Sequence, residues 1–256
     1  MFGKLLKYEF KSIGKWYFAL NSAVILVSIV LGFAVKSLSL LTNDSNNAAQ
    51  AILPVLLMMM LAVLIAGSWI ATLVIIVRRF YKNIYGREGY LTLTLPVSTH
   101  LIILSKLVAS VLWTIFNAIV VALGIMLIFL PNIGVGKMLV ALPSLAQLAS
   151  PAFWLLGIAY LLASWVSSTL MIFLAISIGQ LFSDKRILMG FVSYILLYIL
   201  IVVISMFSTG AFNPLTDDDF PFTTPYFLYT IGECVVQALV FYWGTHYLLK
   251  NHLNIQ

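Results

Sequence analysis

The chain has 256 residues, of which 62% are hydrophobic and only 9% are charged, with a formal net charge of +6. Soluble domains carry about 25% charged residues, so this chain cannot cover a water-exposed surface with charge, and an ordinary soluble protein is excluded. In lipid every backbone polar group needs a partner within the protein, which leaves helix bundles and closed barrels. The single cysteine, Cys234, excludes an internal disulfide and a cysteine-based metal cluster.

Before the first apolar run, residues 1–15 predict an amphipathic helix that lies in the headgroup plane, with lysines toward anionic lipid. The basic residues share one face of this helix: Lys4, Lys7, Lys11 and Lys15. The helix either anchors the topology only or also touches a cytoplasmic partner. The apolar run that follows has the length of a membrane span and no small-residue cleavage site closes it, so we expect this segment to be retained rather than removed as a signal peptide.

The long apolar runs predict transmembrane helices rather than barrel strands. About 20 residues of helix cross the hydrocarbon core, whereas barrel strands are about 10 residues long and alternate in polarity. Six spans are predicted, at residues 16–35, 51–77, 106–130, 153–180, 187–207 and 226–249. The sequence therefore predicts an all-α membrane protein with a single six-span domain over residues 16–256.

The basic residues predict the orientation of the spans, because cytoplasmic loops carry an excess of Lys and Arg. Twelve of the 14 Lys and Arg residues fall on one side. These are Lys4, Lys7, Lys11, Lys15, Arg78, Arg79, Lys82, Arg87, Lys106, Lys185, Arg186 and Lys250. Both termini are therefore expected in the cytoplasm, and an even number of spans agrees with this because it places both termini on the same side. The positive charge is then explained by the membrane, and no nucleic-acid partner is expected.

The connection between the second and third spans, residues 78–100, has an unusual composition for a loop. The helical pattern continues through the tyrosine before Gly86, and Gly86 and Gly89 then allow a turn. Ser98 or Thr99 can cap a new helix that leads into the third span. We therefore expect a helix end, a compact elbow and a fresh helix start.

Aromatic and apolar residues in this loop suggest that another protein binds it. Tyr85, Tyr90, Leu91 and Leu93 are expected to be exposed, and aromatic residues are enriched in protein interfaces. The alternative is an ordinary, positively charged inner loop.

The stretch YGREGYLTLTLPVSTHLIILSKLVASVLW, residues 85–113, resembles the first cytoplasmic loop of small permeases in the type-2 family of ABC transporters. Those permeases have six spans, cytoplasmic termini and an amphipathic N-terminal helix. The resemblance implies that this loop is a coupling helix seated on a separate ATP-binding subunit in a bacterial cell membrane. It implies that the contact is made by Tyr85, Gly86, Arg87, Glu88, Gly89, Tyr90 and Leu91.

The same resemblance implies a second permease copy or a different permease subunit beside this chain, with ATP and Mg bound in the partner. The chain also departs from the family. Residues 208–225 are too short for the two re-entrant helices that many members carry. Glu88 and Leu95-Pro96 lie too close together for the importer type of loop, which favours export.

The chain shows no nucleotide site of its own, so it is not expected to be an enzyme or to hold a cofactor. The string closest to a P-loop, PNIGVGKM, has Pro131 at the first glycine position and Met138 at the hydroxyl position. The second inner loop could make a further contact with the ATPase or could be a plain turn. Its polar residues are Asp184, Lys185 and Arg186.

Glu233 is the acidic residue placed within a span, and Gln237 follows one turn later on the same face. Ionisable residues at membrane depth are candidates for function. Glu233 could contact a cationic substrate together with Gln237, pair with Lys36 or Lys137, or remain neutral.

Two further groups have structural interpretations. Small residues lie near one face of the fourth span and favour close helix packing: Gly157, Ser164, Ser168, Ala175 and Gly179. The histidines have no metal-ligand spacing and are expected to be interfacial: His100, His246 and His252.

The sequence thus favours a permease subunit that exports an amphipathic or hydrophobic substrate, such as an antimicrobial peptide, a drug or a lipid. The alternative is a stand-alone six-span protein, either a proton-coupled carrier or an intramembrane enzyme. A carrier would show broken helices with ionisable groups at the midplane, and an enzyme would show a catalytic constellation.

Overall fold

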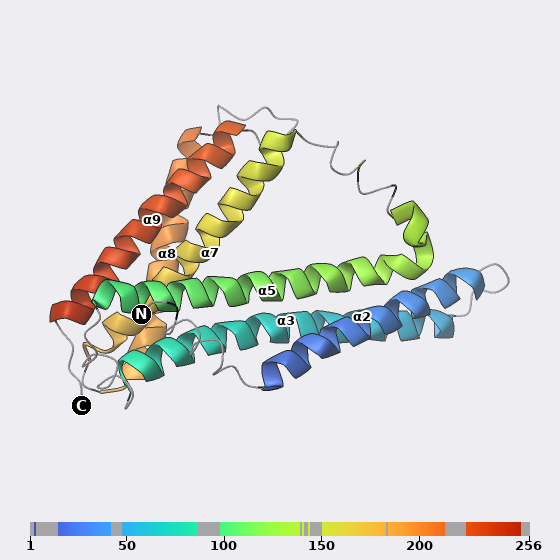
Figure 1. The fold of residues 1–256 in the computed structure, drawn as a ribbon, viewed down its shortest axis with the longest axis horizontal. Coiled ribbons are helices and arrows are strands. Elements are labelled where there is room, and N and C mark those ends of the chain that lie inside the picture. The colour runs from blue at the N-terminus through green and yellow to red at the C-terminus, as the bar shows by residue number, and fades with distance from the viewer. Residues whose placement is uncertain are drawn as a thin grey trace. The chain divides into compact units, whose positions relative to one another are not determined.

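Six long helices dominate the computed structural model (Figure 1). They are α2 (Lys15–Leu41), α3 (Ala48–Ile84), α5 (Thr99–Ile133), α7 (Pro151–Gly179), α8 (Arg186–Phe212) and α9 (Thr224–Asn251). The structure describes residues 15–41, 48–86, 98–138, 150–182, 184–212 and 224–251, together with positions 3, 140 and 143. All six helices are long and apolar enough to cross a membrane, and the described residues include no strand. The predicted all-α, six-helix fold class is confirmed.

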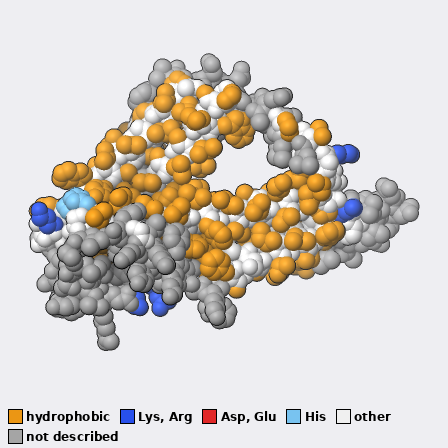
Figure 2. Space-filling model, viewed as in Figure 1, with side chains coloured by type: hydrophobic (Ala, Val, Ile, Leu, Met, Phe, Trp, Pro, Cys, Tyr) orange, Lys and Arg blue, Asp and Glu red, His pale blue; other side chains and the backbone are white. Residues whose placement is uncertain are grey.

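The outer faces of the helices are apolar, as a lipid solvent requires. Val63, Ile187 and Phe207 are 71%, 76% and 78% exposed, and Figure 2 shows hydrophobic side chains over the described helices. Buried positions include many small polar residues, such as Ser28 and Thr245. This distribution, with apolar side chains outside and small polar ones inside, is that of a multi-pass membrane protein.

The helices extend beyond the predicted spans because hydropathy reports only the part in hydrocarbon, whereas water and headgroups can satisfy a protruding turn. Helix α3 continues to Ile84, inside the predicted loop, and α5 already begins at Thr99. Lys106, predicted at the membrane edge, therefore lies within α5 and is only 6% exposed. Pro131, predicted to open the outer loop, lies inside α5 near its end, where a missing backbone donor affects one turn only.

The predicted surface helix falls largely outside the described residues. Lys4, Lys7 and Lys11 are not described, and Lys15 is the first residue of α2. The role of these lysines at the lipid surface stays a prediction.

The chain forms two compact units. One unit comprises Met1–Glu9, Ile76–Val111 and Ser150–Gln256, and the other comprises Phe10–Ile75 and Leu112–Ala149. The first unit, here called the C-terminal unit, contains α7, α8 and α9 with the end of α3 and the start of α5. Its core includes Phe80 stacked on Phe173 with ring centroids 3.9 Å apart.

In the other unit, α2 packs on α3 and α5. The Tyr17 hydroxyl is hydrogen-bonded to Thr72 at 3.1 Å, and the Tyr17 ring meets Trp113 edge-on at 5.6 Å. Further along, Gly32 lies so near α5 that a Cβ there would be 2.9 Å from the Leu127 carbonyl oxygen. Side-chain size at this crossing is thus limited to hydrogen.

Helices α7 and α8 approach closest near the turn that joins them. A Cβ built on Gly179 would lie 2.6 Å from the Gly190 Cα, and Ala175 is also buried there. The predicted packing role of the small residues therefore holds for these two positions. It is wrong for Gly157, which has open space around it, and Ser164 and Ser168 instead line a pocket. The helical period of 3.6 residues predicts which residues share a face of one helix. It does not predict how far along that face a neighbouring helix stays in contact.

We predict that Gly179→Ala destabilises the C-terminal unit by about 1–3 kcal/mol, because the added methyl meets backbone that cannot rotate away. Thermal unfolding of the detergent-purified protein measures this effect. Gly190→Ala is the matched control, since its Cβ would find the nearest atom at 3.7 Å. Equal melting temperatures for the two variants would contradict the proposed helix contact.

Candidate functional site

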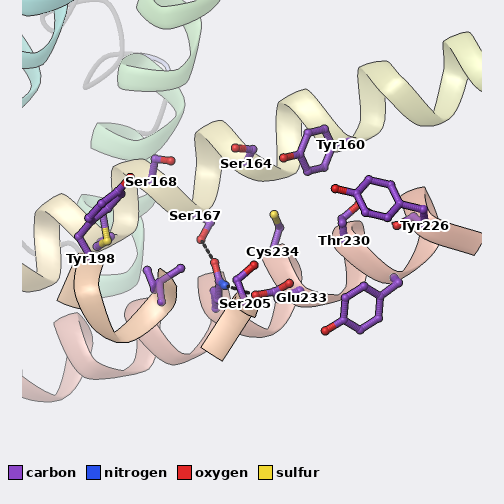
Figure 3. A pocket seen from close by; sticks show the side chains of 14 residues that line it. Tyr160, Ser164, Ser167, Ser168, Tyr198, Ser205, Tyr226, Thr230, Glu233 and Cys234 are labelled. Atoms are coloured by element: carbon purple, nitrogen blue, oxygen red, sulfur yellow. Dashed lines mark hydrogen bonds between the residues drawn. The ribbon is translucent and has the colours of Figure 1, made fainter. Parts of the chain in front are cut away.

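A polar pocket of about 270 Å³ lies in the C-terminal unit between α7, α8 and α9 (Figure 3). Most of the side chains that line it carry hydroxyl, thiol, amide or carboxyl groups. They include Ser164, Ser167, Ser168, Tyr160, Tyr198, Ser205, Tyr226, Tyr229, Thr230, Glu233, Cys234 and Gln237. Such a concentration of polar groups inside a transmembrane unit is costly unless they bind one another or a ligand.

A hydrogen-bonded chain crosses the pocket from α9 to α7. The Gln237 amide donates to Glu233 Oε1 at 3.0 Å, and the Ser167 hydroxyl donates to Gln237 Oε1 at 3.3 Å. Glu233 lies roughly 14 Å along α9 from its first residue, at about 1.5 Å per residue. Glu233 and Gln237, which the sequence singled out, are thus hydrogen-bonded to each other, and Ser167 on α7 is hydrogen-bonded to Gln237.

Helical spacing explains why these side chains meet. On α9, Tyr226, Thr230, Cys234 and Gln237 recur at intervals of three and four residues, so they share one face. On α7 the pocket-lining residues follow the same intervals: Tyr160, Ser164, Ser167, Ser168 and Met171. The pocket was not predicted from the sequence, because Ser164 and Ser168 were assigned to helix packing and the tyrosines of these spans were not connected with them. The available signal was a polar stripe repeated at the same spacing on two spans.

The polar and acidic side chains of the pocket could bind a polar or cationic group. Of the residues that the structure describes, Glu233 is the one charged side chain among those lining it. The described part of the chain contains no group of three or more His, Cys, Asp or Glu side chains that could hold a metal ion. The lining side chains offer a ligand one carboxylate, an amide, a thiol, hydroxyl groups and aromatic rings.

In the loop of residues 78–100, which is predicted to bind a partner, the structure corrects the expectation that Tyr85 is exposed. Tyr85 is half-buried rather than exposed, because its ring packs edge-on against Phe80 and its hydroxyl donates to Ser177 Oγ at 2.9 Å. Burial raises the pKa of Tyr85 to about 12, so the hydroxyl keeps its proton. Gly86 closes the end of α3, where a Cβ would lie 2.6 Å from the Lys82 carbonyl oxygen. The sequence pattern does not show that α7 passes beside this helix end.

The other residues expected at the partner contact lie outside the described part of the chain. These are Arg87, Glu88, Gly89, Tyr90 and Leu91, with Leu93 beyond them. Their contact with an ATP-binding subunit stays a prediction.

The end of the loop is tied to α9. The Ser98 carbonyl accepts from the backbone N–H groups of Leu101 and Ile102, so the predicted new helix start is confirmed at Ser98–Thr99. His100 Nδ1 is hydrogen-bonded to the Tyr242 hydroxyl at 2.6 Å.

The same histidine ring stacks on His246, with centroids 4.0 Å apart. His100 and His246 are therefore more than the membrane-interface residues predicted from the sequence, because their contact joins α5 to α9. His252 lies outside the described residues.

The second inner loop lies beside an open groove. Asp184 and Lys185 are exposed, Arg186 begins α8, and Lys185 has a left-handed backbone with φ 53°. The groove is lined by Tyr81, Lys185, Arg186, Ile187, Leu188 and Phe191. The geometry leaves Asp184 and Lys185 accessible, and their contact with an ATPase stays a prediction.

Comparison with family models, with curated proteins and with solved structures gives no match.

We predict that Cys234 reacts with small methanethiosulfonate reagents because its half-buried thiol lines the pocket. The rate ratio of a trimethylammonium reagent to a sulfonate reagent of similar size should exceed the ratio for a small thiol in water, because Glu233 precedes Cys234 on the same wall. Mass spectrometry of the intact protein measures both rates, and Cys234→Ser provides a blank because it removes the single cysteine. Glu233→Gln should lower this ratio toward that of the small thiol; an unchanged rate ratio would show that Glu233 does not set the pocket's charge.

Proposed function

We propose that this chain is the transmembrane permease subunit of an ATP-driven ABC exporter. It carries an amphipathic or hydrophobic substrate across a bacterial cell membrane, with both termini in the cytoplasm. ATP and Mg bind a separate ATP-binding subunit, which grips the loop at residues 78–100. A second permease copy or a different permease subunit completes the pathway, and ATP hydrolysis takes place in the partner rather than in this chain.

The observation that carries this proposal is that both ends of the loop are fixed to helices that line the pocket. At one end Tyr85 is hydrogen-bonded to Ser177 of α7, and at the other His100 is hydrogen-bonded to Tyr242 of α9. Helices α7 and α9 supply Ser167, Glu233 and most of the remaining pocket wall. A displacement of the loop therefore acts on the pocket directly.

This connection gives ATP a way to change the affinity of the pocket. A ligand shifts a conformational equilibrium only if it binds the two states with different affinities. ATP closes its own subunit around the nucleotide, and the loop transmits this closure to α7 and α9. The pocket then alternates between a state that binds substrate and a state that releases it.

One observation favours the second candidate, a stand-alone proton-coupled carrier: Glu233 lies inside the pocket on a chain of hydrogen bonds to α7. Such a carrier would take up substrate in liposomes with a pH gradient alone. The exporter would instead require the ATP-binding subunit and ATP.

A photo-crosslinking residue placed at Tyr90 should capture a P-loop ATPase from the native membrane, because the coupling loop seats on that subunit. The same residue at Phe207, which is 78% exposed on α8, is the control and should capture none. Mass spectrometry identifies the crosslinked protein. Capture of the ATPase from both positions, or from neither, would contradict the proposed docking.

Once the ATPase is identified, Tyr85→Phe should reduce substrate-stimulated ATP hydrolysis about two- to tenfold, the range expected for one hydrogen bond. Tyr81→Phe, which keeps the Tyr85–Ser177 hydrogen bond, should hydrolyse ATP normally. Glu88→Lys and Gly89→Pro should also uncouple hydrolysis from transport while leaving membrane insertion intact. Normal coupled ATPase activity in all of these variants would rule out the loop as the lever.

A further inference from the structure

We propose that the pocket between α7, α8 and α9 binds a small lipophilic organic cation, such as a quaternary ammonium group bearing apolar substituents. This assigns a chemical class of cargo to the proposed exporter. Transport of the cation therefore rests on that function, whereas binding of the cation by the isolated chain does not.

The charge of the pocket is the first argument. Glu233 is half-buried in a transmembrane helix, and among the described residues that line the pocket it faces no lysine, arginine or histidine. Gln237 orients the carboxylate through Oε1, but an ionised carboxylate offers about four acceptor positions. A carboxylate held in low dielectric is stabilised by a cation, and here the ligand can supply that cation.

Aromatic rings are the second argument. Four tyrosines line the pocket: Tyr160, Tyr198, Tyr226 and Tyr229. Figure 3 shows Tyr160 on α7 and Tyr226 on α9 at the same end of the pocket, beyond Glu233 and Cys234. The faces of aromatic rings attract ammonium groups. Cages formed by several aromatic rings are the usual sites for quaternary ammonium ligands.

Tyr160 and Tyr226, at this end of the pocket, both pack against the buried Phe227. Phe227 is only 7% exposed and meets both Tyr160 and Tyr226 with ring centroids 6.3 Å apart. Phe153 packs edge-on against Phe227 at 5.2 Å. Because these contacts fix the rings before any ligand arrives, binding would cost less conformational entropy than it would in a loop-built site.

Size and ligand type narrow the class of cation. A hard metal ion such as Ca²⁺ needs six to eight oxygen ligands, whereas this pocket combines one carboxylate with hydroxyls and ring faces. A volume of about 270 Å³ lies just below the range of roughly 300–1,000 Å³ for drug-sized ligands. It suits a single cationic headgroup rather than a folded peptide.

The test measures binding of radiolabelled benzyltrimethylammonium to the purified chain in lipid nanodiscs, without ATP or an ATPase. Unlabelled benzyltrimethylammonium should compete, and neopentylbenzene, its neutral isostere, should compete at least about tenfold less well. Glu233→Gln should weaken binding at least about tenfold. Tyr160→Leu should weaken binding severalfold more than Tyr160→Phe, because only the second variant keeps an aromatic ring.

Alkylation places the binding in this pocket. Treatment with N-ethylmaleimide should block binding to the native chain, because Cys234 lines the pocket, but should leave binding to Cys234→Ser unchanged. Thermal unfolding confirms that each variant is folded before its affinity is compared.

Equal competition by the neutral isostere, or full binding by a folded Glu233→Gln variant, would overturn the proposal. So would the lack of any saturable binding to the native chain. These outcomes are separate from the test of the exporter. Cation binding without ATPase crosslinking at position 90 would support the site and contradict the exporter, and the reverse result would do the opposite.

Discussion

Close packing of α7 is the constraint on which both the pocket and the loop anchors depend. At its end, Gly179 lies against the backbone of α8 so closely that a methyl group would not fit. One turn earlier, Leu174 fills the space beside Gly244 of α9, where a Cβ would lie 2.9 Å away, and Phe173 stacks on Phe80 of α3. Three neighbours are thus in direct contact with α7 over a short length, so a shift of any one of them is felt by the others.

Lipid makes a second demand, because buried polar groups must find partners within the protein. Many of the buried hydroxyls meet it locally. Thr169, Ser177 and Thr245 each donate to the backbone carbonyl four residues earlier, at 2.7–2.8 Å. Longer polar side chains cannot all be satisfied in this way. Glu233 and Gln237 are hydrogen-bonded to each other, and Gln237 also accepts from Ser167 on α7, so their pairing depends on how these helices come together.

Close helix packing and the pairing of buried polar groups both occur at the ends of the loop at residues 78–100. The hydroxyl of the half-buried Tyr85 is hydrogen-bonded to Ser177, within the closely packed part of α7. His100 is hydrogen-bonded to Tyr242 of α9. The helices that receive these two hydrogen bonds also carry Ser167, Glu233 and Gln237. In the proposed exporter this connection transmits movement of the loop to the pocket. The affinity of the proposed cation site in that pocket would change as a result. The loop then needs no catalytic group of its own, since its effect is mechanical.

The sequence by itself determined that the protein lies in a membrane, that it has six helices long enough to cross it, and where helices end and begin around the loop at residues 78–100. These follow from composition and from period, which are local properties: charge is scarce, apolar runs exceed the length of a span, and Gly86 and Ser98 carry their conformational preferences with them. It also singled out Glu233 and Gln237, because a carboxylate within an apolar run is visible without any neighbour.

The tertiary structure decided what these residues face. A sequence lists Ser164 and Ser168 beside Gly179 on one face of a span, but only the place where α8 crosses decides that Gly179 packs while the serines line a pocket. It likewise decided that Tyr85 is packed against α7 rather than exposed. Contacts between residues far apart in the chain depend on the crossing positions of whole helices, and hydropathy and helical period carry no information about those positions.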